Sequence, residues 1–267
     1  ILHKQYITPF YPMNTLQKLF EAEGYQGFLS LDTILQVVVK PSPSITSINS
    51  ETDDKDFRLC ESLKNLQERL AARPAGAPPA MAYTQPLDIH VSVINREGKS
   101  VPPNESYPSF YAPYASRIRR MDTCFGSFID FLKQRGMYDQ SVIVLTADHG
   151  DSLGEEGRWG HAYTIFPEIM RIPLIIHLPP QLRKDMVWNT KTLAFSTDIT
   201  PSLYYLLGHK PARHELFGRP LFTATEQEQR EFLQDAYLVA SSYGAVYGIL
   251  RNNGRYLYIA DGVSYQD

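Results

Sequence analysis

The chain has 267 residues, of which 43% are hydrophobic and 21% are charged, and its formal net charge at pH 7 is −3. These values are ordinary for a globular protein, and a chain of this length can bury a large core as one large domain or two small ones. The slightly acidic balance gives no broad basic surface, which argues against a nucleic-acid-binding protein. Because no run of about 18 apolar residues occurs, the sequence predicts no membrane-spanning helix within these residues.

Two local features are expected to be structural. Cys60 and Cys124 are far apart and form no Cys-x-x-Cys metal or redox motif. They can form a disulfide or remain two buried thiols, and we expect free thiols as the simpler state. The basic run Arg117–Arg120 is expected to be the solvated face of a helix.

The first half of the chain alternates predicted helices and strands. Apolar residues at helical spacing predict helices over 14–23, capped by Asn14 or Thr15 and ended by Gly24, and over 57–70. Strands are predicted over 25–31 and 81–85, and 37–39 is either a strand or a buried loop. Proline-rich or polar composition predicts loops over 41–54, 73–79 and 96–109.

The second half begins with a long predicted helix over 114–136, which Gly136 ends. Its apolar stripe consists of Ile118, Met121, Phe125, Phe128, Ile129 and Leu132. Buried strands are predicted over 142–146 and 174–178, and a helix over 198–208 holds Pro201 in its first turn. Asn252-Asn253-Gly254 lies between two apolar segments, 243–250 and 255–259, which predicts a hairpin.

This alternation predicts an α/β fold with a mostly parallel sheet covered by helices on both faces. The final hairpin predicts a small antiparallel addition at the C-terminal end. We therefore expect an α/β core over residues 1–220 and a C-terminal antiparallel subregion over 221–267.

Chemistry is concentrated where the predicted strand over 142–146 ends. Asp148 and His149 follow this strand, and His161 comes after a glycine-rich polar loop. Ligands of open α/β sheets bind at such strand ends, and a carboxylate with a neutral imidazole is a common ligand pair for a divalent metal. The two side chains converge only if the chain turns, which Gly150 permits. The alternative is a helix cap, with Asp148 or Asp151 starting a helix and His149 on the surface.

This block resembles the sulfatase family of the alkaline-phosphatase-like superfamily. The resemblance rests on Asp148-His149-Gly150, on His161 and on Arg171-Ile172-Pro173-Leu174, and it continues over 14–25, 198–203 and 206–208. It implies an alkaline-phosphatase/sulfatase-like sheet flanked by helices. It also implies that Asp148 and His149 hold a divalent metal, with calcium expected first and manganese or zinc as alternatives.

The same resemblance suggests catalytic roles for His161 and His90, which lies just past a predicted strand end. Many sulfatases carry Lys in place of His161, which here would bind a second metal, bind the anionic group or protonate the leaving oxygen. The alternative for both histidines is an ordinary loop position.

The neighbouring polar residues receive mostly structural interpretations. Asp88 is expected to be a turn residue, with support of His90 as the alternative. Arg171 is expected to form a structural ion pair and His177 to be a core histidine. Trp159 would line a substrate pocket or pack against the protein. Three loop charges are expected to be solvated: Glu155, Glu156 and Arg158.

The family's nucleophile lies upstream of the segment matching 14–25, and it is absent from these residues. The sequence therefore predicts a fragment of a metal-dependent sulfuric ester hydrolase that acts on a small anionic ester. The alternatives are a phosphoethanolamine-transferase-like phosphotransferase or phosphodiesterase, and a catalytically inactive binding or regulatory domain. Any export signal or membrane anchor is expected before Ile1, and the family suggests a periplasmic, extracellular or membrane-anchored protein.

Overall fold

The computed structural model describes residues 16–30, 39, 42–48, 58–162, 164–210, 218–241 and 243–262. The chain divides into two compact units, Ile1–Arg135 and Gly136–Asp267. The predicted division at 220/221 stays a prediction. The proposed caps Asn14 and Thr15 and most of the segment 37–39 lie outside the described residues.

A parallel sheet with the strand order β2-β1-β3 forms the centre of the first unit. Its strands are β1 (Gln26–Ser30), β2 (Ile45–Ser47) and β3 (Ala80–Thr84), and β1 pairs in parallel with both neighbours. The strands predicted over 25–31 and 81–85 are confirmed. The loop predicted over 41–54 is wrong at β2, because the β-branched Ile45 and Thr46 favour a strand and Ile48 directly after it is buried.

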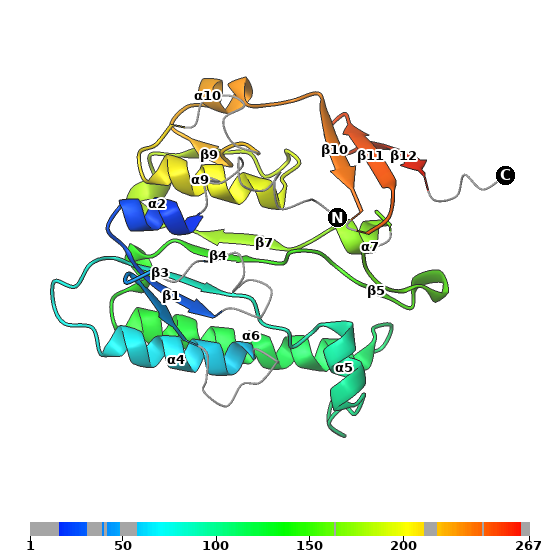
Figure 1. Ribbon diagram of the computed structural model, residues 1–267, viewed down its shortest axis with the longest axis horizontal. Helices are drawn as coiled ribbons and strands as arrows, with labels where there is room; N and C mark the ends of the chain where they lie inside the picture. The colour runs from blue at the N-terminus through cyan, green and yellow to red at the C-terminus, as the bar shows by residue number, and fades with distance from the viewer. Residues whose placement is uncertain are drawn as a thin grey trace. The chain divides into compact units, whose positions relative to one another are not determined.

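Four helices of the first unit are described: α2 (Leu16–Ala22), α4 (Leu59–Ala71), α5 (Val91–Glu97) and α6 (Ala112–Gln134). Figure 1 shows α4 and α6 side by side along the sheet. The predicted helices are confirmed for the residues described. The loop predicted over 96–109 is wrong at its start, because Val93 and Ile94 bury one side of α5, which therefore continues to Glu97.

The basic run on α6 is not uniformly solvated as predicted. Arg117 is buried, and its Nη1 atom donates to Glu97 Oε2 at 2.8 Å and to the carbonyl oxygen of Asp88 at 3.0 Å. Ile118, placed in the apolar stripe, is 44% exposed. Asp88 is buried and accepts the Leu59 N–H at the start of α4, so its role in this unit is structural, and burial raises the pKa of its carboxyl group.

A disulfide between Cys60 and Cys124 joins α4 to α6, with 5.3 Å between the two Cα atoms. The expectation of free thiols is therefore wrong. No local spacing signals this pair, because the cysteines are 64 residues apart and meet only when the two helices pack. Structural disulfides persist in oxidising compartments and are rare in the cytosol.

Breaking this disulfide should lower the free energy of unfolding by about 2–4 kcal/mol, because it closes a long loop in the unfolded chain. Urea denaturation of the oxidised chain and of the Cys60→Ala/Cys124→Ala variant measures the difference. Equal midpoints for the two proteins would show that the bond does not constrain the unfolded state.

In the second unit, β4 (Ile143–Thr146) pairs antiparallel with β7 (Leu174–His177). Both strands were predicted, but they are half-buried rather than buried, and Ile175 is 64% exposed. Between them lie the hairpin β5 (Ser152–Leu153) and β6 (Trp159–Gly160), and the short helix α7 (Pro167–Met170). The described part of this connection contains only short elements, which is compatible with an antiparallel pair because antiparallel neighbours need no crossover helix.

The rest of the second unit consists of one longer helix and several short elements. The helix predicted over 198–208 is confirmed as α9 (Ile199–Leu206). The short elements are α8 (Pro180–Arg183), β8 (Val187–Trp188), β9 (Phe222–Thr223), α10 (Glu226–Glu231) and the 3-10 turns Tyr138–Gln140, Glu155–Gly157 and Ser196–Asp198. None of the helices in the described ranges is long and apolar enough to cross a membrane.

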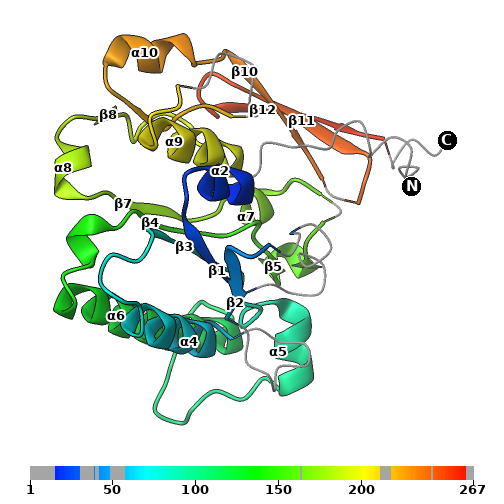
Figure 2. The same ribbon diagram turned by 60° about the vertical axis from the view of Figure 1, so that its left-hand side comes forward.

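Three antiparallel strands end the described chain: β10 (Ala236–Ala240), β11 (Val246–Arg251) and β12 (Tyr256–Asp261) (Figure 2). The predicted hairpin is confirmed as β11–β12, with Asn252, Asn253 and Gly254 all at positive φ in its turn. Strand β10 was not predicted; its Val239 is buried with Ile165 and Val246. The α/β class, with a parallel sheet, flanking helices and a C-terminal antiparallel sheet, is confirmed.

Candidate metal centre

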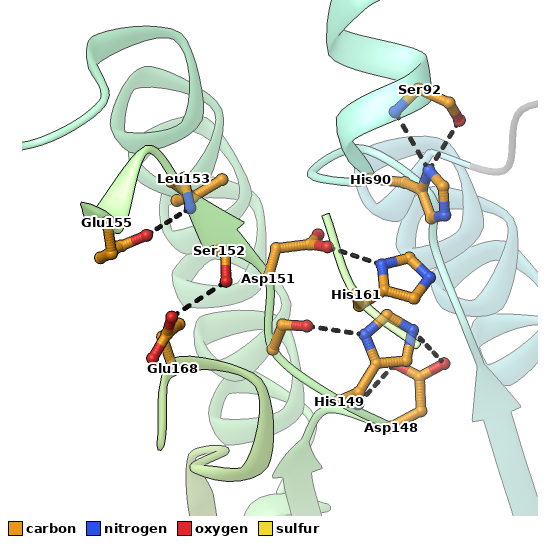
Figure 3. A network of polar contacts seen from close by, with 11 residues as sticks. His90, Ser92, Asp148, His149, Asp151, Ser152, Leu153, Glu155, His161 and Glu168 are labelled. Atoms are coloured by element: carbon orange, nitrogen blue, oxygen red, sulfur yellow. Dashed lines mark hydrogen bonds and ion pairs between the residues drawn. The ribbon is translucent and has the colours of Figure 1, made fainter. Parts of the chain in front are cut away.

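Asp148 and His149 lie just beyond the end of β4, and their side chains face each other (Figure 3). Asp148 Oδ1 accepts the backbone N–H of His149 at 3.0 Å, and Asp148 Oδ2 lies 3.7 Å from His149 Nε2. The chain therefore leaves the strand before these residues, so that neighbouring side chains do not point to opposite faces. The convergence predicted from the sequence is present.

Gly150 serves a different purpose from the one predicted. Its φ is not among the positive values of the described glycines, so no left-handed turn requires it. Instead, a Cβ atom at this position would lie 2.1 Å from the carbonyl oxygen of Glu168, and the Gly150 N–H donates to Ile169 O at 2.8 Å. Glycine is needed because the backbone of α7 closely approaches residues 148–150, which we call the metal-motif segment.

The β5–β6 hairpin follows Gly150 in the chain and determines which side chains face each other next to it. Its register pairs Ser152 with Gly160 and Leu153 with Trp159. One further step along the same register places Asp151 opposite His161. The two side chains meet there, with Asp151 Oδ1 and His161 Nδ1 2.6 Å apart.

Glu168 on α7 anchors this hairpin. It accepts hydrogen bonds from Ser152 Oγ at 3.0 Å and from Arg158 Nη2 at 2.9 Å, and the Arg158 guanidinium stacks 4.0 Å from the ring centroid of Phe166. Hydrogen bonds from its own backbone N–H, from Arg158 and from Ser152 lower the pKa of the Glu168 carboxyl group, against the opposing effect of burial.

These contacts correct two predictions. Arg158 is not a solvated loop charge, because it also pairs with Glu156. Arg171, which was expected to make a structural ion pair, is exposed and makes none within the described ranges. The structural ion pair of this segment is therefore Arg158–Glu168.

Three ligand-type side chains gather at this end of the hairpin. The donor atoms of His149, Asp151 and His161 lie within 4.8 Å of one another, and the two imidazole centroids are 3.9 Å apart. His149 Nδ1 lies 2.9 Å from the carbonyl oxygen of Gly150. A carbonyl only accepts, so Nδ1 carries the proton and Nε2 of a neutral His149 keeps its lone pair.

A divalent metal fits the pair formed by Asp148 and His149. Two atoms that each lie about 2.0–2.2 Å from one ion are separated by at most about 4.4 Å. The 3.7 Å between Asp148 Oδ2 and His149 Nε2 satisfies this limit. A carboxylate with an imidazole nitrogen is also a chemically suitable ligand pair.

The other predicted residues are placed as follows. His90 belongs to the first unit and caps α5, where its Nδ1 atom accepts the Ser92 N–H at 3.2 Å and the Ser92 hydroxyl at 2.7 Å. His177 is half-buried, as expected of a core histidine: its Nε2 donates to Tyr138 O at 3.1 Å. Trp159 lies against Gly154 and is 55% exposed, so its role as a pocket residue stays a prediction.

Asp151 is the residue of the cluster to which sequence reasoning assigned no site role. The spacing of Asp151 and His161 is visible in the sequence, but its meaning depends on a two-residue strand pairing. The glycines at 154, 157 and 160 signal a turn, although they do not fix its register.

A family model described as Sulfatase matches residues 3–209 of this chain. The chain belongs to the sulfatase family. The choline-sulfatase of Rhizobium meliloti is 28% identical over 152 residues, which are 55% of this chain and 28% of that enzyme. The N-acetylglucosamine-6-O-sulfatase of Bacteroides thetaiotaomicron is 24% identical over 151 residues, which are 55% of this chain and 26% of the relative.

The matched part of this sulfatase-family chain thus spans only about a quarter of these relatives' lengths. A solved structure, the phosphonate monoester hydrolase of Agrobacterium radiobacter, is similar with a TM-score of 0.60 and 14% identity, covering 94% of this chain and 72% of that one. This likeness concerns the fold. Divalent-metal dependence is general in the superfamily.

Gly150→Ala should lower the free energy of unfolding by about 2 kcal/mol or more, because the new Cβ forces α7 away from the metal-motif segment. Gly126→Ala is the control: it lies within α6, where an added Cβ meets nothing within 4 Å, and alanine favours a helix. Urea denaturation compares the two variants. A Gly150→Ala protein as stable as the control would contradict the close approach.

Glu168→Gln should loosen the hairpin, so that the Ser152 and Leu153 amide protons exchange faster and stability falls by about 1 kcal/mol. Because the pKa of Glu168 is lowered, its contribution is present above its ordinary value of 4.5 and is lost as the pH falls through the lowered pKa. The control is Glu226→Gln, which removes an exposed ion pair with Arg230. Unchanged hydrogen exchange in Glu168→Gln would show that Glu168 is not the anchor.

Proposed function

We propose that this chain is the metal-binding part of a sulfatase-family hydrolase that cleaves a small anionic ester. The observation that carries the proposal is the convergence of Asp148 and His149 just beyond the end of β4, with Asp148 Oδ2 and His149 Nε2 spaced for one ion. Family membership supports the reaction class, because the relatives with which the chain aligns include named sulfatases.

Each residue has a distinct role in this proposal. Asp148 and His149 hold the metal, which when bound polarises the ester oxygen and favours ionisation of the nucleophile. His161 binds near the transferring group and assists the leaving oxygen. For His90 we keep the role that the family resemblance suggests, stabilisation of charge on the transferring group. Within its own unit its Nδ1 atom accepts from Ser92, so a neutral ring carries its proton on Nε2.

The donor set bears on which metal is bound. Family resemblance suggests calcium, which prefers oxygen ligands. His149 supplies an imidazole nitrogen, and imidazole suits zinc and other transition metals better than calcium. We therefore propose manganese or zinc ahead of calcium for this chain.

A sulfate ester is the proposed substrate, since both relatives described above are named as sulfatases. A phosphate ester is the alternative. It is favoured by His161, which stands where many sulfatases have a lysine, because a neutral imidazole lacks the positive charge of that lysine. Substrate identity depends on the nucleophile, which the proposal places on a part of the complete protein outside these residues.

The proposed cellular compartment rests on the disulfide of the first unit and not on the metal centre. A disulfide between α4 and α6 is stable in the periplasm or outside the cell and is rare in the cytosol. We propose that the complete protein acts in such an oxidising compartment.

Assays of the complete protein with an aryl sulfate and an aryl phosphate diester, with and without chelator, test the function. We expect chelator-sensitive sulfate hydrolysis that Asp148→Ala and His149→Ala reduce by at least about 100-fold. Asp185→Ala, which changes an exposed carboxylate away from the site, is the control and should retain full activity.

Turnover of the phosphate diester alone would replace the sulfate proposal with the phosphoryl-transfer alternative. If the complete protein binds no metal and hydrolyses neither ester, the chain is an inactive binding or regulatory domain and the proposal fails.

A further inference from the structure

We infer that Asp151 is a positioning residue that acts through His161, holding its ring at Nδ1 so that Nε2 is the nitrogen that takes part in the reaction. This inference rests on the proposed function of His161. It adds a residue to the site and assigns it a role different from that of Asp148.

The hairpin register brings Asp151 to His161. Ser152 pairs with Gly160, so Asp151, which precedes Ser152, faces His161, which follows Gly160. Side chains directly opposite each other in an antiparallel pair are close neighbours. The 2.6 Å contact is thus a consequence of backbone pairing, and Glu168 holds that pairing from α7 through Ser152 and Arg158.

The chemistry of the contact defines the state of the ring. The Asp151 side chain is 8% exposed, and an ionised carboxylate can only accept hydrogen bonds. His161 Nδ1 must therefore donate, which leaves Nε2 of the neutral ring without a proton. The neighbouring His149 reaches the same state by donating from Nδ1 to the Gly150 carbonyl oxygen.

Burial and direction distinguish the two aspartates. Asp148 is 59% exposed at its side chain, and its Oδ2 atom lies toward His149 Nε2, where a ligand of the metal should be. Asp151 is nearly buried, and its Oδ1 atom is hydrogen-bonded to His161 Nδ1 (Figure 3). Carboxylates that hold the second nitrogen of a functional histidine orient the ring and fix its tautomer.

Loss of such an outer carboxylate typically costs 10–100-fold in metal affinity or activity. We therefore expect Asp151→Ala to lower kcat by about 10–100-fold, with a smaller change in KM. Asp151→Asn keeps an oxygen that can accept from Nδ1 and should lose less. It also preserves the shape of a nearly buried side chain, so it remains informative if Asp151→Ala folds poorly.

The direct test is nitrogen-15 NMR of histidine-labelled, metal-free protein at a pH where His161 is neutral, with the His161 signals assigned by comparison with His161→Gln. We expect the proton on Nδ1 in the wild type and a shift toward Nε2 in Asp151→Ala. Asp185→Asn is the control and should leave the tautomer and kcat unchanged. Titration with Mn²⁺ or Zn²⁺ alone then compares Asp151→Ala with Asp148→Ala.

An unchanged tautomer and an unchanged kcat in Asp151→Ala would overturn the inference. It would also be overturned if Asp151→Ala lost metal binding as completely as Asp148→Ala while the His161 tautomer stayed the same, because Asp151 would then be a ligand. The proposed function fails separately: normal metal binding in Asp148→Ala would refute it, whatever the tautomer shows in the metal-free protein.

Discussion

The candidate site depends on one close approach between backbones, in which the segment after β4 meets α7 at Gly150. The hydrogen bond from Gly150 to Ile169 and the proximity of the Glu168 carbonyl oxygen leave no room for a side chain. The same residue, Glu168, reaches Ser152 and Arg158 with its carboxylate. One short helix therefore fixes both the residues that follow the strand and the hairpin that returns His161 to them.

This arrangement explains how a mostly exposed loop can hold a defined cluster. Hairpins of two-residue strands are weak alone, because they bury little apolar surface. Here three contacts support the hairpin: the Arg158–Glu168 ion pair, the hydrogen bond from the Ser152 hydroxyl to Glu168, and the contact of Arg158 with the Phe166 ring. The imidazoles of His149 and His161 are each held at Nδ1, one by a carbonyl oxygen and the other by a carboxylate. In both rings Nδ1 is therefore the nitrogen held by the protein.

Sequence signals that act within a few residues predicted several turns and long helices, whereas contacts between separate elements were not predicted. The Asn252-Asn253-Gly254 turn and the long helix ended by Gly136 were predictable, because backbone conformation and periodicity act within a few residues. The disulfide, the burial of Arg117 and the pairing of Asp151 with His161 depend on contacts between separate elements. Asp148, His149 and His161 were recognised through the family resemblance, whereas Asp151 needed the hairpin register.

X-ray absorption spectroscopy of the protein loaded with Mn²⁺ or Zn²⁺ tests the central claim most directly, because it reports the atoms bound to the ion. The account predicts a first shell of nitrogen and oxygen donors with the outer scattering of an imidazole ring, and it predicts that His149→Ala loses this outer scattering. An ion surrounded by oxygen alone in the wild type, or an unchanged spectrum in His149→Ala, would contradict the assignment of Asp148 and His149 as the metal ligands.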